Sequence, residues 1–295
     1  MSTSDNEEST MKSSEDVAAV SADHSTASAD HSTASADHST VSADHSAAVA
    51  DHSAAVADHS AAVADHSAAA ADRSTAARIR ESLDIEMRDV KEGVLRMGSY
   101  VEEQILAAHD AIMCRDAELA QKVIASDGRV NETQRAVSAL VGMTIATQAP
   151  VARDLRFLLA LDRVTYELER IGDHAGSVAK QARKLAGVTS MVTYDELTPM
   201  ATLAAQQVRD VVMALVDIDE ARAREVAGRD DEIDRLYHQV FDDVLAEMRT
   251  DPLKVDPGTR ILFAAHYLER IGDRVTNIAE DVVFLATGEV EDLNP

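Results

Sequence analysis

The sequence LERIGD occurs twice in this chain, at residues 168–173 and at residues 268–273. Each copy places a glutamate and an aspartate four residues apart, a spacing that brings both side chains to one face of an α-helix. The four carboxylates belong to Glu169, Asp173, Glu269 and Asp273. A glycine lies between them in each copy, Gly172 or Gly272, although glycine costs a helix about 1 kcal/mol relative to alanine. The repeat therefore predicts two acidic helical sites on one duplicated scaffold.

A polar pair with the same four-residue spacing precedes each copy. The first pair is Asp127 and Asn131, and the second is Asp230 and Asp234. The offset between the copies is 103 residues at the aspartates (230 minus 127) and 100 at the glutamates (269 minus 169). Loops absorb such a difference more easily than packed helices do. We interpret residues 79 to about 288 as a tandem duplication.

The composition favours helices over strands. The chain has no Trp, only 3% aromatic residues, 11 Gly and 5 Pro among 295 residues. Apolar residues recur at three- and four-residue spacing, which is typical of amphipathic helices. The predicted helices are 79–112, 115–147, 151–186, 195–217, 219–249 and 258–287.

The short connections predict how these helices associate. Links as short as 113–115 and 218–219 join antiparallel neighbours. We therefore predict an all-α fold, a tandem repeat of two three-helix bundles with six long helices. The first bundle is expected at 78–190 and the second at 191–295, after a low-complexity tail at 1–77.

The tail repeats Ala-Asp-His-Ser every seven residues between residues 22 and 67. Its only bulky apolar residues are scattered valines, too few to offset the entropy of ordering. We expect a disordered or transiently helical tail that arose by expansion of the repeat. Histidine binds transition metals and titrates near neutral pH, so metal buffering or pH response is the alternative. Neighbouring histidines on a helix would lie about 10 Å apart, too far to share one ion.

The net charge of −25 bears on the partners of the chain. An acidic protein repels nucleic-acid phosphates, so cations or basic protein surfaces are the expected partners. No stretch approaches the roughly 18–20 apolar residues of a spanning helix, and the first ten residues lack the features of a signal peptide. Cys114 is the only cysteine, which rules out an intrachain disulfide. We expect a cytoplasmic protein that meets membranes only through partners.

Three stretches of the chain resemble the PhoU family of bacterial phosphate-uptake regulators. They are IRESLDIEMRDVKEGVLRMGSYVEEQI at 79–105, PVARDLRFLLALDRVTYELERIGDHAGSVAK at 150–180 and ILFAAHYLERIGDRVTNIAEDVVFLATGE at 261–289. The resemblance implies two tandem three-helix bundles with an E(D)xxxD motif in each. It also implies a non-enzymatic negative regulator that links the phosphate ABC transporter to a sensor kinase. The expected partners are the nucleotide-binding subunit of the transporter, the sensor histidine kinase and a possible second copy of the chain.

The resemblance also implies a metal role for the two motifs, since some family members bind multinuclear iron or zinc clusters there. Carboxylate and amide oxygens without thiols suit hard or borderline cations such as iron, manganese, magnesium, calcium and zinc. The predicted metal ligands are Glu169, Asp173, Asp127 and Asn131 in the first repeat and Glu269, Asp273, Asp230 and Asp234 in the second. Two alternatives stay open: a solvated acidic face paired with Arg170 and Arg270, and an adaptor whose acidic sites are empty.

The two copies also differ from one another. His174 follows the first motif, whereas Arg274 stands at the equivalent place in the second. Asn277 lies one turn later in the second copy and is matched by Ser177 in the first. If histidine or asparagine takes part in the site, the two halves are not equivalent.

Enzymatic readings find little support in the sequence. A di-iron carboxylate enzyme typically uses Glu-x-x-His, but here Gly172 and Gly272 occupy the histidine position. No Ser-His-Asp, Cys-His or glycine-rich phosphate-loop pattern takes its place. We expect a non-enzymatic phosphate regulator, with a metal-binding adaptor for another transporter as the alternative.

Overall fold

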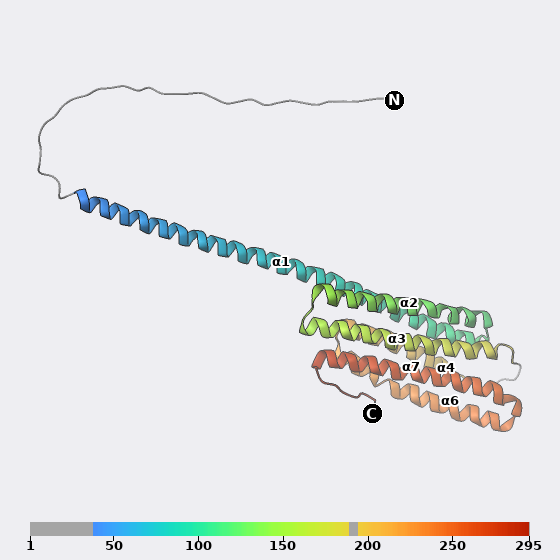
Figure 1. Ribbon diagram of the computed structural model, residues 1–295. Helices are drawn as coiled ribbons and strands as arrows, with labels where there is room; N and C mark the ends of the chain where they lie inside the picture. The colour runs from blue at the N-terminus through green and yellow to red at the C-terminus, as the bar shows by residue number, and fades with distance from the viewer. Residues whose placement is uncertain (1–37, 189–193, 295) are drawn as a thin grey trace, which may run out of the picture. The chain divides into compact units, whose positions relative to one another are not determined.

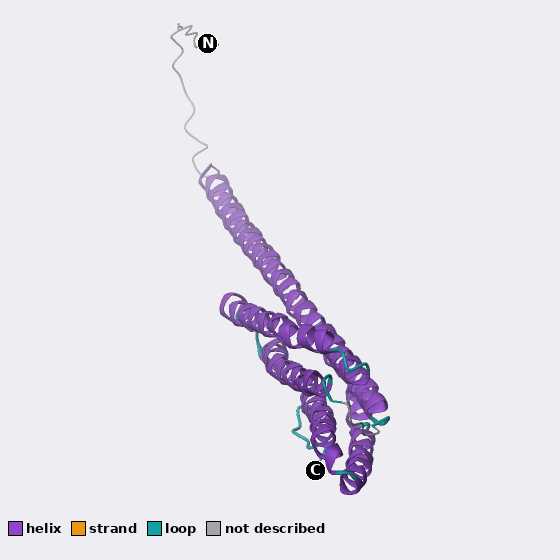
Figure 2. Ribbon diagram, turned by 90° about the vertical axis from the view of Figure 1, so that its right-hand side faces the viewer, coloured by secondary structure: helices purple, strands orange, loops and turns teal. Residues whose placement is uncertain are grey.

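The computed structural model describes residues 38–188 and 194–294. Within these ranges every regular element is a helix (Figure 2). The elements are α1 (His38–Met113), α2 (Ala117–Gln148), α3 (Ala152–Leu185), α4 (Leu197–Asp217), α5 (Glu220–Ala227), α6 (Asp230–Thr250), the short 3₁₀ helix η1 (Pro252–Lys254) and α7 (Val255–Thr287). The predicted all-α fold is confirmed. None of these described helices combines the length and apolar character that a membrane-spanning segment needs.

The chain divides into two compact units, Met1–Ala70 and Ala71–Pro295. Residues 38–77 lie within helix α1, and every described side chain from 51 to 80 is exposed. Alanine has the highest helix propensity, which explains how this part of α1 is helical although its described side chains are exposed. Of the disordered or transiently helical tail expected up to residue 77, the described part is thus helical, and residue 77 marks no helix boundary. The part of the expected tail at 1–37 lies outside the described residues.

The second unit is built around the helix pair α3 and α7, which pack against each other (Figure 1). Helix α2 packs on α3, and helices α4, α5 and α6 pack on α7. Helix α1 contributes a fully buried stripe at three- and four-residue spacing, formed by Val90, Val94, Met97, Val101 and Ile105. These helices form the predicted tandem repeat of two helical bundles.

The polar contacts between α3 and α7 show that the two helices run antiparallel. Arg163 near the start of α3 pairs with Asp281 near the end of α7. Glu167, one turn further along α3, pairs with Arg274, which lies earlier on α7. The two LERIGD motifs therefore lie near the middle of the same helix pair.

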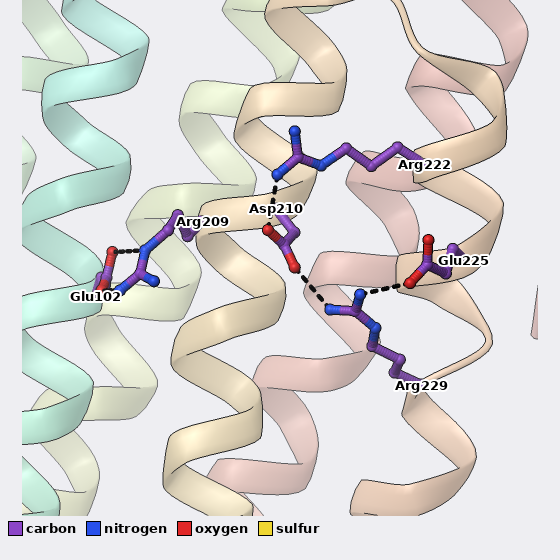
Figure 3. A network of polar contacts seen from close by, with 6 residues as sticks. All are labelled: Glu102, Arg209, Asp210, Arg222, Glu225 and Arg229. Atoms are coloured by element: carbon purple, nitrogen blue, oxygen red, sulfur yellow. Dashed lines mark hydrogen bonds and ion pairs between the residues drawn. The ribbon is translucent and has the colours of Figure 1, made fainter.

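The predicted helix at 219–249 is interrupted, and an arginine network lies at the interruption (Figure 3). Asp210 of α4 accepts hydrogen bonds from Arg222 of α5 (2.8 Å) and from Arg229 (2.6 Å), which precedes α6. Arg229 also donates to Glu225 at 2.7 Å. Burial raises the pKa of Asp210, but the two arginines outweigh it and lower the pKa below its usual range. The network fixes the junction between α5 and α6, and α6 then begins at Asp230.

Two acidic clusters as the candidate functional site

The motif glycines allow helices α2 and α6 to approach closely. A Cβ atom at Gly272 of α7 would collide with Oδ1 of Asp230, the first residue of α6. A Cβ atom at Gly172 of α3 would lie 3.1 Å from Oε1 of Gln104 and 3.4 Å from Cγ1 of Val130. At Gly272 the Asp230 carboxylate occupies the space of a side chain, whereas at Gly172 the neighbouring side chains are only in tight contact with that space. Close packing therefore accounts for the helix-propensity cost of glycine most directly in the second copy.

The first acidic cluster joins α2 to α3. Asn131 Nδ2 donates a hydrogen bond of 2.9 Å to Asp127 Oδ2. Burial raises the pKa of Asp127, and the nearby Asp173 raises it further against the opposing effects of Lys180 and Asn131. Burial also raises the pKa of Glu169, followed by the effect of Asp173. The structure thus brings the four predicted residues of this repeat into one electrostatically coupled group.

The second cluster joins α6 to α7 and is the more deeply buried of the two. Asp230 is only 3% exposed. Burial, followed by the charges of Asp234, Asp273 and Glu269, raises the pKa of Asp230 to about 7. Burial and the charges of Asp273 and Asp234 likewise raise the pKa of Glu269 to about 7, against the effect of Arg270. Four carboxylates share this cluster, and they favour uptake of positive charge as a proton or as a cation.

Each cluster leaves a buried carboxylate oxygen without a hydrogen-bond partner. These atoms are Oδ1 of Asp127 and Oδ1 of Asp230, which occupy equivalent positions of the two repeats. In the second cluster Glu269 Oε2 also lacks a hydrogen bond, although His266 Nδ1 lies 3.2 Å away. An unsatisfied buried polar group costs about 1–3 kcal/mol. The donor chemistry therefore suits a cation that coordinates oxygen.

The positions of these donors do not form a closed coordination sphere. Within residues 38–188 and 194–294, no three His, Cys, Asp or Glu side chains converge closely enough to hold a metal ion. The motif arginines also lie beside the motif carboxylates, Arg170 Nε at 3.7 Å from Glu169 and Arg270 Nη1 at 3.4 Å from Asp273. The chemistry of these oxygen donors thus suits a cation. In the structure, however, their side chains do not converge on one point, and some of them pair with arginine.

Two residues of the second cluster were absent from the sequence prediction. His266 lies three residues before Glu269, so helical spacing gave a signal for it. Asn294 Nδ2 donates a hydrogen bond of 3.0 Å to Asp230 Oδ2 across 64 residues of sequence. No local pattern indicates that second contact.

Comparison with known proteins agrees with this duplicated architecture. The family model for the PhoU domain matches residues 94–182 and again residues 197–282. The chain belongs to the PhoU family. Each match contains one LERIGD motif, so the two PhoU domains correspond to the two acidic clusters.

Curated PhoU relatives resemble the chain over nearly their whole length. The "phosphate-specific transport system accessory protein PhoU homolog" of Clostridium acetobutylicum is 35% identical over 216 residues, which cover 73% of this chain and 99% of that protein. The protein of the same description from Xylella fastidiosa is 36% identical over 211 residues, covering 72% and 89%.

Two solved PhoU structures share the fold. PhoU from Pseudomonas aeruginosa has a TM-score of 0.66 and 32% identity, covering 70% of this chain and 99% of that one. The "phosphate transport system regulatory protein PhoU" from Streptococcus pneumoniae has a TM-score of 0.67 and 28% identity, covering 71% and 99%. About 30% of this chain lies outside each of these two matches.

Proposed function

We propose that the chain is a non-enzymatic negative regulator of phosphate uptake and of phosphate-starvation signalling. The observation that carries this proposal is the extent of the match, since both repeats and 99% of a phosphate-specific transport accessory protein are covered. A likeness confined to one bundle would support only a shared helical unit. Here the complete PhoU architecture is present, with both acidic motifs on the central helix pair.

In this proposal the regulator acts by docking on the cytoplasmic side of the membrane. Its helical faces contact the nucleotide-binding subunit of the phosphate ABC transporter and the phosphate sensor histidine kinase. A protein that binds one state of the transporter more tightly than another couples that state to the kinase through the difference in affinity. The net charge of −25 supports basic surfaces on these partners.

We propose in addition that the two acidic clusters take up cations, iron or zinc by family resemblance. The buried oxygens that lack partners and the coupled carboxylates support this step. Asp127, Asn131, Glu169 and Asp173 would hold the ions of the first cluster, and Asp230, Asp234, Glu269 and Asp273 those of the second. A bound cation would neutralise the repulsion among the carboxylates, and the side chains must rotate to converge on it.

Deletion of the gene tests the regulatory role. In phosphate-replete medium the deletion strain should express phosphate-starvation genes, measured as phosphatase activity, and its phosphate uptake should change. Re-introduction of the wild-type chain should restore repression. Unchanged phosphatase expression and unchanged uptake, in a strain without a second PhoU-family gene, would contradict the proposal.

Docking is tested separately with the purified chain and the nucleotide-binding subunit. Binding measured by calorimetry should weaken as the salt concentration rises, because the acidic surface contributes to the encounter. An absence of binding to both the subunit and the kinase, together with derepressed phosphatase expression in the deletion strain, would show that the regulator acts through another partner.

A further inference from the structure

The segment that follows α7, residues 288–294, folds back and is fastened to the second bundle. Gly288 ends the helix with φ 82°, a left-handed conformation that favours glycine. Glu291 then accepts hydrogen bonds of 2.8 and 2.9 Å from Arg224 of α5. Leu293 donates its backbone N–H to Glu280 Oε1 at 3.0 Å, and its side chain packs against the core. We call residues 288–294 the strap.

The strap ends on the second acidic cluster. Asn294 Nδ2 donates to Oδ2 of Asp230, and the other oxygen of that carboxylate has no partner. Asn294 also lines a polar pocket of about 280 Å³ together with Arg270, Asp273 and Asn277 of α7. The strap therefore forms part of the wall around the cluster.

Comparison of the repeats shows what Asn294 replaces. In the first cluster Asp127 Oδ2 accepts from Asn131 Nδ2 at 2.9 Å, and both residues lie on α2. The position equivalent to Asn131 in the second repeat is Asp234, and an ionised carboxylate has no hydrogen to donate. Asn294 supplies the missing amide from the strap, at nearly the same distance and to the equivalent oxygen.

The amides of Asn131 and Asn294 differ in how easily they can dissociate from the aspartate that each contacts. Asn131 is fixed one helical turn from Asp127, whereas Asn294 is exposed and is held by the few contacts of the strap. The Asn294 amide and a cation would both interact with the carboxylate of Asp230. The hydrogen atoms of the amide carry partial positive charge and repel a cation. Uptake of a cation at Asp230 is therefore opposed by docking of the strap.

We infer that the strap is an intramolecular competitor of cations at the second acidic cluster. Docking of Asn294 on Asp230 lowers the cation affinity of this cluster, and a bound cation in turn releases the strap, because such linkage is reciprocal. The first cluster keeps its amide on its own helix, so it takes up cations independently of the strap. This inference rests on the proposed cation uptake. It implies that the strap regulates cation binding at the second cluster but not at the first.

The test titrates the full chain with Mn²⁺ alone in the Asp173→Ala background, which weakens the first cluster. A parallel titration with Asp273→Ala added defines the Mn²⁺ that the histidine repeats and other sites bind. Asn294→Ala removes the amide, and Glu291→Gln frees the strap from Arg224. Glu289→Gln, in the same segment and with the same change of charge, is the matched control because its side chain makes none of these contacts.

Asn294→Ala and Glu291→Gln should each tighten Mn²⁺ binding at the second cluster by about two- to tenfold, the worth of one hydrogen bond of about 0.5–1.5 kcal/mol. Glu289→Gln should leave the affinity unchanged. In the wild-type chain Mn²⁺ should also speed amide hydrogen exchange at Leu293, whose N–H is bonded to Glu280. Hydrogen exchange at Leu293 therefore reports release of the strap independently of the measured Mn²⁺ affinity.

Equal or weaker Mn²⁺ binding in both strap variants, with exchange at Leu293 unaffected, would overturn the inference. Weaker binding would show that Asn294 contributes a ligand instead of competing with one. If Asp273→Ala removes no bound Mn²⁺ from any variant, cation uptake at this cluster fails and the inference fails with it. The deletion phenotype judges the regulatory role independently of these outcomes.

Discussion

Glu167 of α3 and Arg274 of α7 are joined across the central helix packing, with Arg274 Nη1 at 3.4 Å from Glu167 Oε2. In the duplication Tyr267 is the counterpart of Glu167, and His174 is the counterpart of Arg274. Tyr267 and His174 are also in contact, with their rings stacked and the ring centroids 6.0 Å apart. The same crossing point is thus occupied once by an ion pair and once by an aromatic pair. The change from His174 to Arg274 between the motifs is accordingly matched on the opposite helix by the change from Tyr267 to Glu167.

Exchanging one pair for the other tests this relationship. Glu167→Tyr and Arg274→His should each destabilise the chain by about 0.5–1 kcal/mol, because each removes the ion pair between two partly buried side chains. The double variant restores an aromatic pair and should recover most of the loss. Urea unfolding of the four proteins gives the coupling energy, and strictly additive losses would contradict the pairing.

Replacement of the motif glycines should have unequal effects. Gly272→Ala should lower stability because its Cβ collides with Asp230, whereas Gly172→Ala meets the amide of Gln104 at 3.1 Å and should be milder. Gly176→Ala is the control, since a Cβ there has no neighbour within 4 Å and should gain about 1 kcal/mol of helix propensity. Thermal melts would contradict the packing argument if Gly272→Ala behaved like the control.

Sequence patterns predicted helices well where buried apolar residues recur at three- and four-residue spacing. The helix expected at 151–186 is α3, Ala152–Leu185, and the helix expected at 195–217 is α4, Leu197–Asp217. The patterns placed the start of the last helix at 258, but α7 begins at Val255. Pro257 is tolerated there because the first turn of a helix needs no N–H donor. Helix α1 extends back to His38, and its described side chains from 51 to 80 are exposed. Alanine propensity favours such a helix, but apolar periodicity gives no signal for it.

The acidic clusters were predictable as groups of residues but not in their conformation. Four-residue spacing placed Glu169 with Asp173 and Glu269 with Asp273, and the duplication pointed to the polar pairs on the preceding helices. The side-chain rotamers decide whether the carboxylate oxygens converge on one point, and no sequence pattern predicts these rotamers. The contact of Asn294 with Asp230 depends on how a segment without regular structure folds back over the bundle.

Removal of the residues before Thr75 should leave the bundle unchanged. The described side chains from 51 to 80 are exposed, so truncation loses helix without losing core. The thermal midpoint of the shortened chain should stay within about 5 °C of the full chain, equivalent to about 1 kcal/mol. Circular dichroism should show a loss of helical signal that corresponds to the residues removed. A larger fall in the midpoint would show that the removed segment stabilises the bundle.

Stability should fall as the pH rises from about 4 to above 7 when no cation is bound. The pKa values of Asp230 and Glu269 are raised to about 7 in the folded chain, so it keeps protons that the unfolded chain has already lost. Unfolding is then progressively favoured until both pKa values are passed. Asp230→Asn and Glu269→Gln should each flatten this dependence, measured as the urea midpoint with chelator present. The exposed Asp242→Asn is the control, and an unaltered slope in both cluster variants would refute the assignment.

Cations should oppose this loss if the clusters take them up. At a pH above 7 the carboxylates repel one another, so an ion bound only by the folded chain raises its thermal midpoint, and the rise grows with the logarithm of the cation concentration once that concentration exceeds Kd. Asp173→Ala and Asp273→Ala should each remove the metal of one cluster, and the double variant should bind no more than the histidine repeats retain. Elemental analysis after dialysis and melting with and without chelator measure both effects. If the clusters are solvated faces paired with Arg170 and Arg270, each substitution changes stability by no more than about 0.5 kcal/mol, and chelator changes nothing.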